Sequence, residues 1–305
     1  MLQQTRVAAA RPYYARFLRR FPSLRALAAA PVDRVLAAWS GLGYYRRARH
    51  LHEAARRVIE EHAGRVPRDP VAFGRLPGVG RYTTGAVLSI AFDLRLPVLD
   101  GNVARVLARL HAAPVSIREP RHARVLWALA DSLVPMRAPG EWNQALMELG
   151  ACVCTPSAPR CGDCPLRRWC RAYAGGRPEH LPLTSRRRPV ERIRRAVALV
   201  ENRGRVLLAR RTGALLDGLW EPPGVELMNG GSPQRALTAE LQRLGVRAQL
   251  EATGHTVRHV ITHRAIEVEV WRGRGAGRLS SGAAWHDGVR ERPLTALARK
   301  LLRAG

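Results

Sequence analysis

The stretch Leu76-Pro77-Gly78-Val79-Gly80, followed by Arg81-Tyr82-Thr83-Thr84-Gly85, decides the fold of the N-terminal half of this 305-residue chain. Proline and glycine break the chain here, and apolar residues recur at helical spacing on the far side. Glycine permits backbone angles that a side chain forbids. A tight hairpin between two helices turns its amides outward and forms a nest for one phosphate oxygen. We therefore predict that DNA contacts Leu76, Gly78, Val79, Gly80 and Arg81.

An acidic residue follows the hairpin at the start of the next predicted helix, in Leu99-Asp100-Gly101-Asn102. Aspartate is a preferred helix N-cap, which is one interpretation of Asp100. The other is a fixed carboxylate that stabilises a cation. A sugar that loses its base passes through an oxocarbenium-like state, which such a carboxylate suits. Downstream of the hairpin, we favour the second interpretation.

The charge of the chain favours a polyanionic partner. The formal net charge is +27 and the sequence pI is about 11.6. Nucleic acid is the usual partner of such a surface. The alternative is that the positive charge reflects a drift of the genome toward arginine, because Lys300 is the single lysine. There is no run of 18 apolar residues, which excludes a membrane span, and the first residues lack the features of a signal peptide. We expect a cytoplasmic protein.

The pattern of the chain changes near residue 180. Apolar residues at helical spacing predict helices over 32–39, 52–62, 83–92, 103–111 and 121–133. A basic stretch over 184–195 predicts a linker. Beyond it we expect strands over 196–200, 206–209 and 265–270 and helices over 232–244 and 294–302. We therefore expect a mostly α region over 1–180, a linker over 181–192 and a mixed α/β domain over 193–305.

The five cysteines lie together between Cys152 and Cys170. A tight cluster without an export signal indicates a metal site in a reducing compartment rather than a disulfide framework. Four of the cysteines follow the spacing C-x6-C-x2-C-x5-C, namely Cys154, Cys161, Cys164 and Cys170. Four thiolates in one loop can hold a tetrahedral zinc ion or an iron–sulfur cube, and ligand type leaves the two open. We expect Cys152 to pack in a helix.

These motifs together resemble the adenine DNA glycosylase (MutY) family, within the helix–hairpin–helix glycosylases related to endonuclease III. The resemblance runs through residues 1–5, 41–45, 76–85, 99–103, 143–147 and the four cysteines. It implies a helix–hairpin–helix DNA glycosylase region with a [4Fe-4S] cluster in loop 152–170, followed by a Nudix-like α/β domain. It also implies removal of adenine mispaired with 8-oxoguanine or guanine in double-stranded DNA. The protein is expected to be a monomer in the bacterial cytoplasm, associated with the nucleoid.

The resemblance assigns roles to single residues. Asp100 matches the carboxylate that stabilises the oxocarbenium ion or bonds transiently to C1′, and Asn102 matches a residue that orients the site. Tyr44 resembles the wedge that stacks beside the lesion base. Gln3 and Gln4 match a pair of residues that enters the DNA helix where the base leaves.

Tyr82 separates this chain from the bifunctional relatives. Lyases of the superfamily carry a lysine at the matching position, and a Schiff base requires an amine. Because Tyr82 stands there, the resemblance implies a monofunctional glycosylase that leaves the abasic site uncut.

In the C-terminal half, residues 224–246 follow the outline of a Nudix box but lack its cluster of glutamates. Glu240 is the nearest acid. Hard divalent cations need several oxygen ligands, so nucleotide hydrolysis is not expected. The resemblance implies that this domain recognises 8-oxoguanine, with Thr262 and His263 in the place of a family Phe-Ser-His loop. A plain hairpin turn is the alternative.

The family's general acid is a glutamate two residues before the segment that matches Met1-Leu2-Gln3-Gln4. That position lies before Met1. Either the gene start is assigned too late, which we favour, or the polypeptide binds lesions without excising the base. General acid catalysis contributes about 10²- to 10⁴-fold. Glu148 lies on a predicted helix nearby, but we do not assign it the role.

Overall fold

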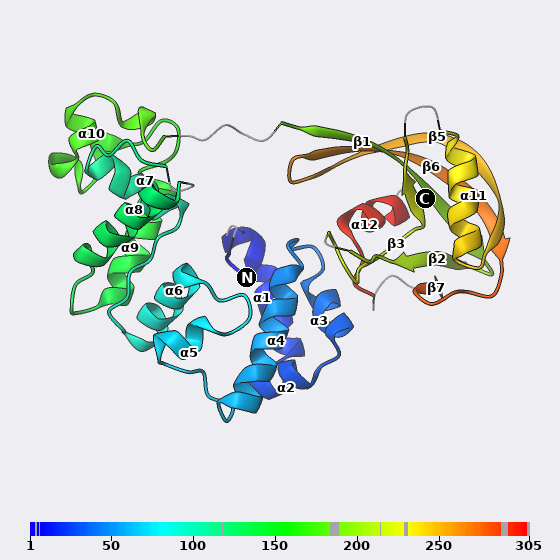
Figure 1. Ribbon diagram of the computed structural model, residues 1–305, viewed down its shortest axis with the longest axis horizontal. Helices are drawn as coiled ribbons and strands as arrows, with labels where there is room; N and C mark the ends of the chain where they lie inside the picture. Colours follow the sequence, from blue (N-terminus) through cyan, green and yellow to red (C-terminus); the bar gives the residue numbers. More distant parts are fainter. Residues whose placement is uncertain are drawn as a thin grey trace. The chain divides into compact units, whose positions relative to one another are not determined.

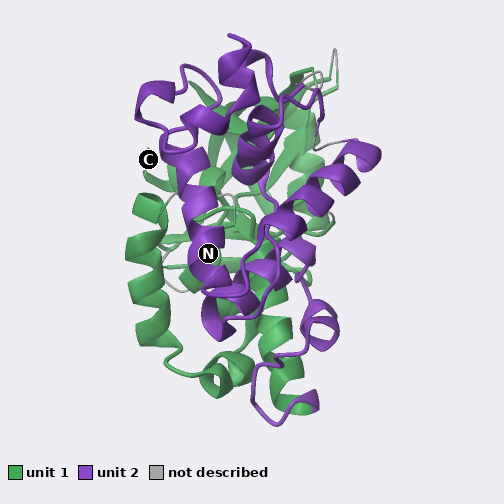
Figure 2. Cartoon of the chain, turned by 90° about the vertical axis from the view of Figure 1, so that its left-hand side faces the viewer, with its two compact units in different colours: residues 1–60, 188–305 green, residues 61–187 purple. Residues whose placement is uncertain are grey.

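A computed structural model describes residues 1–3, 5, 7–116, 119–183, 189–213, 215–228, 231–287 and 292–303. Its contacts divide the chain into two compact units (Figure 2). The first joins Met1–Glu60 to Arg188–Gly305, and the second is Glu61–Arg187. The first unit thus combines the start of the predicted helical region with the predicted α/β domain. The sequence-based domain boundaries remain a prediction.

Four helices begin the first unit: α1 (Val7–Arg20), α2 (Leu24–Ala29), α3 (Val32–Trp39) and α4 (Arg46–Glu61). Their apolar faces form one core that contains Phe17, Leu36 and Trp39. Leu219, from the C-terminal segment, is fully buried in the same core. The helices and the C-terminal segment therefore share apolar packing, which is the dominant favourable term in folding.

The C-terminal segment of the first unit is a mixed sheet (Figure 1). The central strand β1 (Glu191–Asn202) pairs in parallel with β6 (Arg264–Ala276) and antiparallel with β2 (Arg205–Arg210). The strand order is β3-β2-β1-β6-β5, with β4 paired to β1 and β7 to β2. The remaining strands are β3 (Trp220–Glu221), β4 (Gly224–Glu226), β5 (Arg247–Ile261) and β7 (Ala283–His286).

Helices cover both faces of the central strand. Residues of β1 with even numbers, such as Ala196 and Ala198, pack with Leu237 of α11 (Pro233–Arg243). Those with odd numbers, such as Val197, pack with Leu297 of α12 (Ala296–Arg303). Because successive side chains point to opposite faces, a strand buried on both sides reads as a continuous apolar run. The expected mixed α/β fold of this region is confirmed.

The basic stretch over 184–195 does not end before the sheet. β1 begins at Glu191, inside this stretch, and Arg195 is 9% exposed. Its guanidinium pairs with Glu221, which is 5% exposed. Arginine on a strand can therefore face the interior when a carboxylate meets it there. Residues 184–188 lie outside the described part of the chain.

The second unit is helical. It contains α5 (Pro70–Gly74), α6 (Arg81–Phe92), α7 (Gly101–Leu110), α8 (Pro120–Leu133) and α9 (Pro139–Cys152). Short turns follow over Cys161–Asp163, Arg167–Trp169, Arg171–Ala174 (α10) and Pro178–His180. The core lies between α7, α8 and α9, around Val103, Leu107 and Leu126. The expected mostly α region is confirmed. Among the described residues, no helix has both the length and the apolar character to cross a membrane.

A buried ion cluster organises one end of the sheet domain. Glu221 accepts hydrogen bonds from Arg195 and Arg211 at Oε1, and its Oε2 accepts from Thr295 Oγ1 at 3.3 Å. Burial by itself raises the pKa of Glu221, but the two guanidinium groups outweigh it and hold the pKa below the ordinary value of this carboxyl. The carboxylate is therefore the common partner of two arginines.

Replacing Glu221 by glutamine is expected to lower the free energy of unfolding at pH 7 by about 3–5 kcal/mol, because two arginines lose their shared counter-charge. The native pKa is depressed, so this stabilisation is complete above the ordinary glutamate pKa of about 4.3 and declines as the pH falls below it. Urea unfolding of both proteins across this range is the measurement. Glu226→Gln, at an exposed strand position, is the control. A loss below about 1 kcal/mol at pH 7 contradicts the account.

Candidate functional site

The predicted hairpin is a tight turn that leads directly into α6. Leu76 is buried, and its carbonyl accepts from the amide of Val79 at 3.1 Å. Gly78 has φ of +73°, a conformation that favours glycine. Gly80 is the N-cap of α6 and makes no side-chain hydrogen bond to the first turn. Arg81 is exposed, with its guanidinium 4.1 Å from the centre of the Trp127 ring. The turn thus presents backbone and one cation at a helix N-terminus.

Asp100 is the N-cap of α7. Its Oδ1 accepts from the amides of Asn102 at 2.9 Å and Val103 at 2.7 Å. Its Oδ2 accepts from Asn102 Nδ2 at 3.1 Å. The two interpretations of Asp100, a helix N-cap and a fixed carboxylate, are compatible. As an N-cap, its carboxylate is fixed at the positive end of the helix dipole. Asn102 is the residue that fixes its second oxygen.

A buried arginine connects this cap to the cysteine segment. Arg105 Nη2 donates to Asn102 Oδ1 at 2.9 Å and to the carbonyl of Gly150 at 2.6 Å. Its Nε donates to the carbonyl of Cys154 at 2.7 Å. Asn102 can present its oxygen to Arg105 only while its amide nitrogen faces Asp100. The guanidinium therefore fixes the orientation of the Asn102 side chain.

Tyr82 lies on α6 within electrostatic reach of Asp100. Its hydroxyl donates to Met147 Sδ at 3.4 Å, and the ring is half-buried. Burial raises the pKa of Tyr82, and the negative charge of Asp100 raises it further. The phenol is thus neutral at physiological pH. The structure brings Tyr82, Asp100 and Asn102 together.

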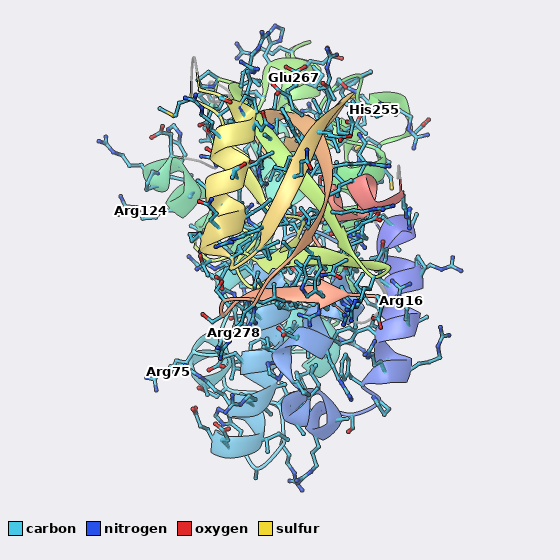
Figure 3. All side chains as sticks on the ribbon, turned by 90° about the vertical axis from the view of Figure 1, so that its right-hand side faces the viewer. Arg16, Arg75, Arg124, His255, Glu267 and Arg278 are labelled. Atoms are coloured by element: carbon cyan, nitrogen blue, oxygen red, sulfur yellow. The ribbon has the colours of Figure 1, made fainter. Side chains whose placement is uncertain are left out.

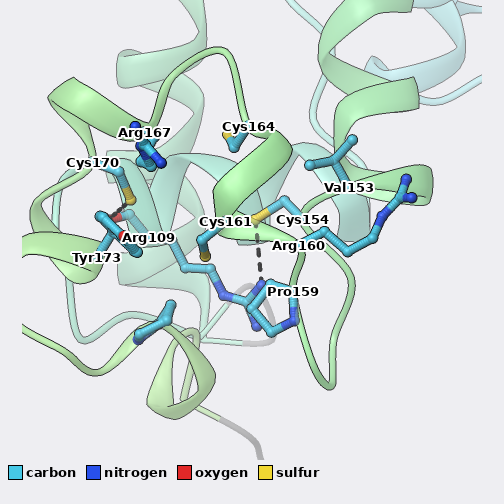
Figure 4. Close-up of a pocket in the computed structure, with 11 residues that line it drawn as sticks. Arg109, Val153, Cys154, Pro159, Arg160, Cys161, Cys164, Arg167, Cys170 and Tyr173 are labelled. Atoms are coloured by element: carbon cyan, nitrogen blue, oxygen red, sulfur yellow. Dashed lines mark hydrogen bonds between the residues drawn. The ribbon is translucent and has the colours of Figure 1, made fainter.

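The four predicted cysteine ligands line one hollow (Figure 4). Burial raises the pKa of the Cys161 and Cys164 thiols, and the neighbouring cysteines add to the rise in both cases. Four thiols that line one hollow fit a group that supplies positive charge and binds thiolate sulfur. Within the described residues, no three His, Cys, Asp or Glu side chains are arranged around a single metal-ion position. Cys152 ends α9 and is exposed, so it lies in a helix without being packed.

Arg109 ties the cysteine segment to α7. Its side chain is 2% exposed, and Nη1 donates to Cys154 Sγ at 3.3 Å (Figure 4). Nη1 also donates to the carbonyl of Thr155 at 2.7 Å. Nε donates to the carbonyl of Leu181 at 2.9 Å. The sequence analysis missed Arg105 and Arg109. Their spacing of four residues within an apolar helix is the signal, because it places both charges on one helix face.

The other predicted DNA contacts lie in the first unit. Tyr44 is 53% exposed, and Gln3 is exposed with its carbonyl accepting from Arg47. Gln4 lies outside the described residues. Thr262 and His263 form the two-residue turn between β5 and β6, with Thr262 at φ of +56°. A hairpin turn is therefore their geometry, and a role in reading a base stays a prediction.

Comparison with known families agrees with this arrangement. Residues 1–130 match the HhH-GPD superfamily of base excision DNA repair proteins, and residues 196–304 match the NUDIX domain. A solved thermostable thymine-DNA glycosylase is 30% identical, with a TM-score of 0.53 over 57% of this chain and 80% of that chain. A non-covalent endonuclease III–DNA complex is 25% identical, with a TM-score of 0.50 and the same coverage. The hairpin and the capped carboxylate thus stand in a fold of the base excision repair class.

Adenine DNA glycosylase of Mus musculus is 38% identical over 320 residues, which cover 89% of this chain and 62% of that protein. The chain is thus similar over most of its length to adenine DNA glycosylases, and its first 130 residues match the HhH-GPD superfamily. It spans about three fifths of the length of the mammalian relatives.

Close backbone packing at Gly150 gives a direct test of the site geometry. A Cβ at this position of α9 would lie 2.7 Å from Asn102 Cβ and 2.8 Å from the Asn102 carbonyl oxygen. Gly150→Ala is expected to cost about 1–3 kcal/mol in the free energy of unfolding, because α7 must move. Denaturant unfolding measures this cost. Gly101→Ala, where a Cβ meets open space, is the matched control and should not destabilise. Equal midpoints for both variants would refute the packing described.

Proposed function

We propose that this chain is a monofunctional DNA glycosylase that hydrolyses the N-glycosidic bond of adenine opposite 8-oxoguanine or guanine in double-stranded DNA. The observation that carries the proposal is the capped carboxylate of Asp100, held by Asn102 and Arg105 in the unit that also contains the hairpin. The choice of adenine as the released base is supported by similarity to a mouse relative that is named adenine DNA glycosylase.

The proposed chemistry follows from the fixed position of the carboxylate. As the bond from C1′ to adenine breaks, positive charge develops on the sugar. Asp100 stabilises that charge without reorganising, because its two oxygens are already held by amides and by Asn102. Water then adds to C1′ and the abasic strand remains intact. Tyr82 offers no amine for a Schiff base, and the single lysine, Lys300, donates to the carbonyl of Arg258 at 2.9 Å.

We assign DNA contact to three sets of residues. The hairpin residues Leu76, Gly78, Val79, Gly80 and Arg81 hold one phosphate at the α6 N-terminus. Gln3 and Gln4 enter the base stack where adenine leaves, and Tyr44 stacks as a wedge beside the lesion base. These inserted side chains offset part of the few kcal/mol that flipping costs. Thr262 and His263 read the 8-oxoguanine. Many of the 51 basic residues project from the surface, as Arg16, Arg75 and Arg124 do in Figure 3, and can neutralise phosphates.

We further propose that Cys154, Cys161, Cys164 and Cys170 hold a [4Fe-4S] cluster. Bound there, the cluster neutralises four thiolates and fixes the loop that follows α9. Arg109 already holds the backbone of this loop at Thr155 and Pro156. The protein would act as a monomer in the cytoplasm, on nucleoid DNA.

Single-turnover excision on an A:8-oxoguanine duplex tests the proposal. It is run on the 305-residue chain and on a form that also carries any in-frame codons upstream of Met1. Adenine release is expected, with strand cleavage only after alkali. Asp100→Asn is expected to abolish release and to retain duplex binding, because the amide removes the charge but preserves the shape. Release by neither form, or strand cleavage without alkali accompanied by borohydride trapping, would contradict the proposed function.

A further inference from the structure

The turn that carries Tyr44 is strained and exposed. It joins α3 to α4 through Ser40-Gly41-Leu42-Gly43-Tyr44-Tyr45, which we call the wedge turn. Gly41 and Gly43 have φ of +110° and +69°. Tyr44 has φ of +46°, which is uncommon for an aromatic residue, and its side chain is 53% exposed. Such a conformation persists only when the surroundings over-determine it.

The next residue, Tyr45, is anchored in the sheet domain. Its ring is 5% exposed, and its hydroxyl donates to the carbonyl of Leu294 at 3.2 Å. The same hydroxyl accepts from the amide of Gly41 at 3.3 Å, which closes the wedge turn. Ser40 Oγ donates to the Leu294 carbonyl at 3.2 Å as well. One carbonyl of the C-terminal segment thus receives two hydroxyls from the two ends of the turn.

The Leu294 carbonyl is itself rigidly placed. Leu294 is 1% exposed and forms a parallel bridge with Trp220 of β3. On either side of it, the Trp220 amide donates to the Pro293 carbonyl at 2.9 Å, and the Thr295 amide donates to the Trp220 carbonyl at 3.1 Å. Thr295 Oγ1 donates to Glu221, the centre of the buried ion cluster. The anchor therefore belongs to the core of the sheet domain.

Side chains of the helical segment hold the opposite edge of the turn. Trp39 Nε1 donates to the Gly43 carbonyl at 3.1 Å. The Arg47 guanidinium lies 5.3 Å from the centre of the Tyr44 ring and donates to the Leu42 carbonyl at 3.4 Å. The aromatic ring is therefore displayed from a turn that is fixed at both edges.

We propose that Tyr45 and Ser40 are positioning residues for DNA binding, and that the sheet domain, through the Leu294 carbonyl, holds Tyr44 in the conformation that enters the base stack. The inference rests on the proposed function, because it takes Tyr44 as the inserted side chain. A preorganised turn lowers the entropy that binding must spend on ordering it. The C-terminal domain then has a second task besides contact with the lesion.

A double-mutant cycle on duplex affinity tests the functional part. Tyr45→Phe is expected to weaken binding to an A:8-oxoguanine duplex on the order of tenfold, because the Leu294 anchor and the Gly41 amide lose their shared hydroxyl. In a Tyr44→Ala background the same substitution should change affinity less than about twofold, since it acts through Tyr44. Ser40→Ala should weaken binding in the same direction. Tyr14→Phe, an exposed phenol on α1, is the matched control. Equal effects in both backgrounds would overturn the proposal.

Hydrogen–deuterium exchange of the free protein tests the anchor without DNA. Tyr45→Phe should speed exchange of the peptide that contains residues 39–47, and Tyr14→Phe should not. If the wild-type chain does not prefer the mismatched duplex, the proposed function fails while the exchange result still decides the anchor. Unchanged exchange in Tyr45→Phe would overturn the anchor whatever the affinity.

Discussion

The geometry of the candidate active site depends on the buried guanidinium of Arg105, whose N–H groups need hydrogen-bond acceptors. Arg105 is 8% exposed, and burial lowers its pKa. A charge removed from water is costly, by several kcal/mol, unless every donor finds a partner. Arg105 finds them at Asn102 Oδ1 and at the carbonyls of Gly101, Gly150 and Cys154. The start of α7, the end of α9 and the first cysteine of the cluster are therefore fixed around one side chain.

This constraint connects the cysteine hollow to the capped carboxylate. Arg105 donates both to the carbonyl of Cys154 and to Asn102 Oδ1. Asn102 in turn holds Asp100. Rigid placement matters because a preorganised charge stabilises a developing cation without spending energy on reorientation. The loop would thus support catalysis through α7.

The sheet domain is coupled to the helices in a comparable way. Leu219 completes the core of α1–α4, and Arg49 pairs with Asp217 at 3.4 Å. Arg210 pairs with Asp33 at 2.9 Å. These surface ion pairs contribute little by themselves. The shared apolar core and the Leu294 anchor connect the sheet domain to the wedge turn.

Much of this arrangement could be predicted from local patterns in the chain. Apolar spacing predicted α3 over its observed range, and Ser232 predicted the start of α11. The tight turn over 76–80 and the helix start at Asp100 could be predicted because the backbone requirements of glycine and of an N-cap are local. Arg105, Arg109 and Arg195 were missed, since composition treats arginine as a surface residue and only tertiary contacts supply its buried acceptors. The grouping of 1–60 with the C-terminal domain was also beyond local reasoning, because it depends on long-range packing.

The most direct measurement of the central claim is single-turnover adenine release by Arg105→Lys, in the form of the protein that excises adenine, with duplex affinity measured in parallel. A lysine ammonium cannot reproduce the planar fork that reaches Asn102, Gly150 and Cys154 together. The account predicts that release slows about 10- to 100-fold, as for other residues that orient a ligand through a hydrogen bond, while affinity changes less than about twofold. Arg124→Lys, at an exposed position of α8, should alter neither quantity. Wild-type release by Arg105→Lys, or a loss explained by weaker binding, would contradict the claim.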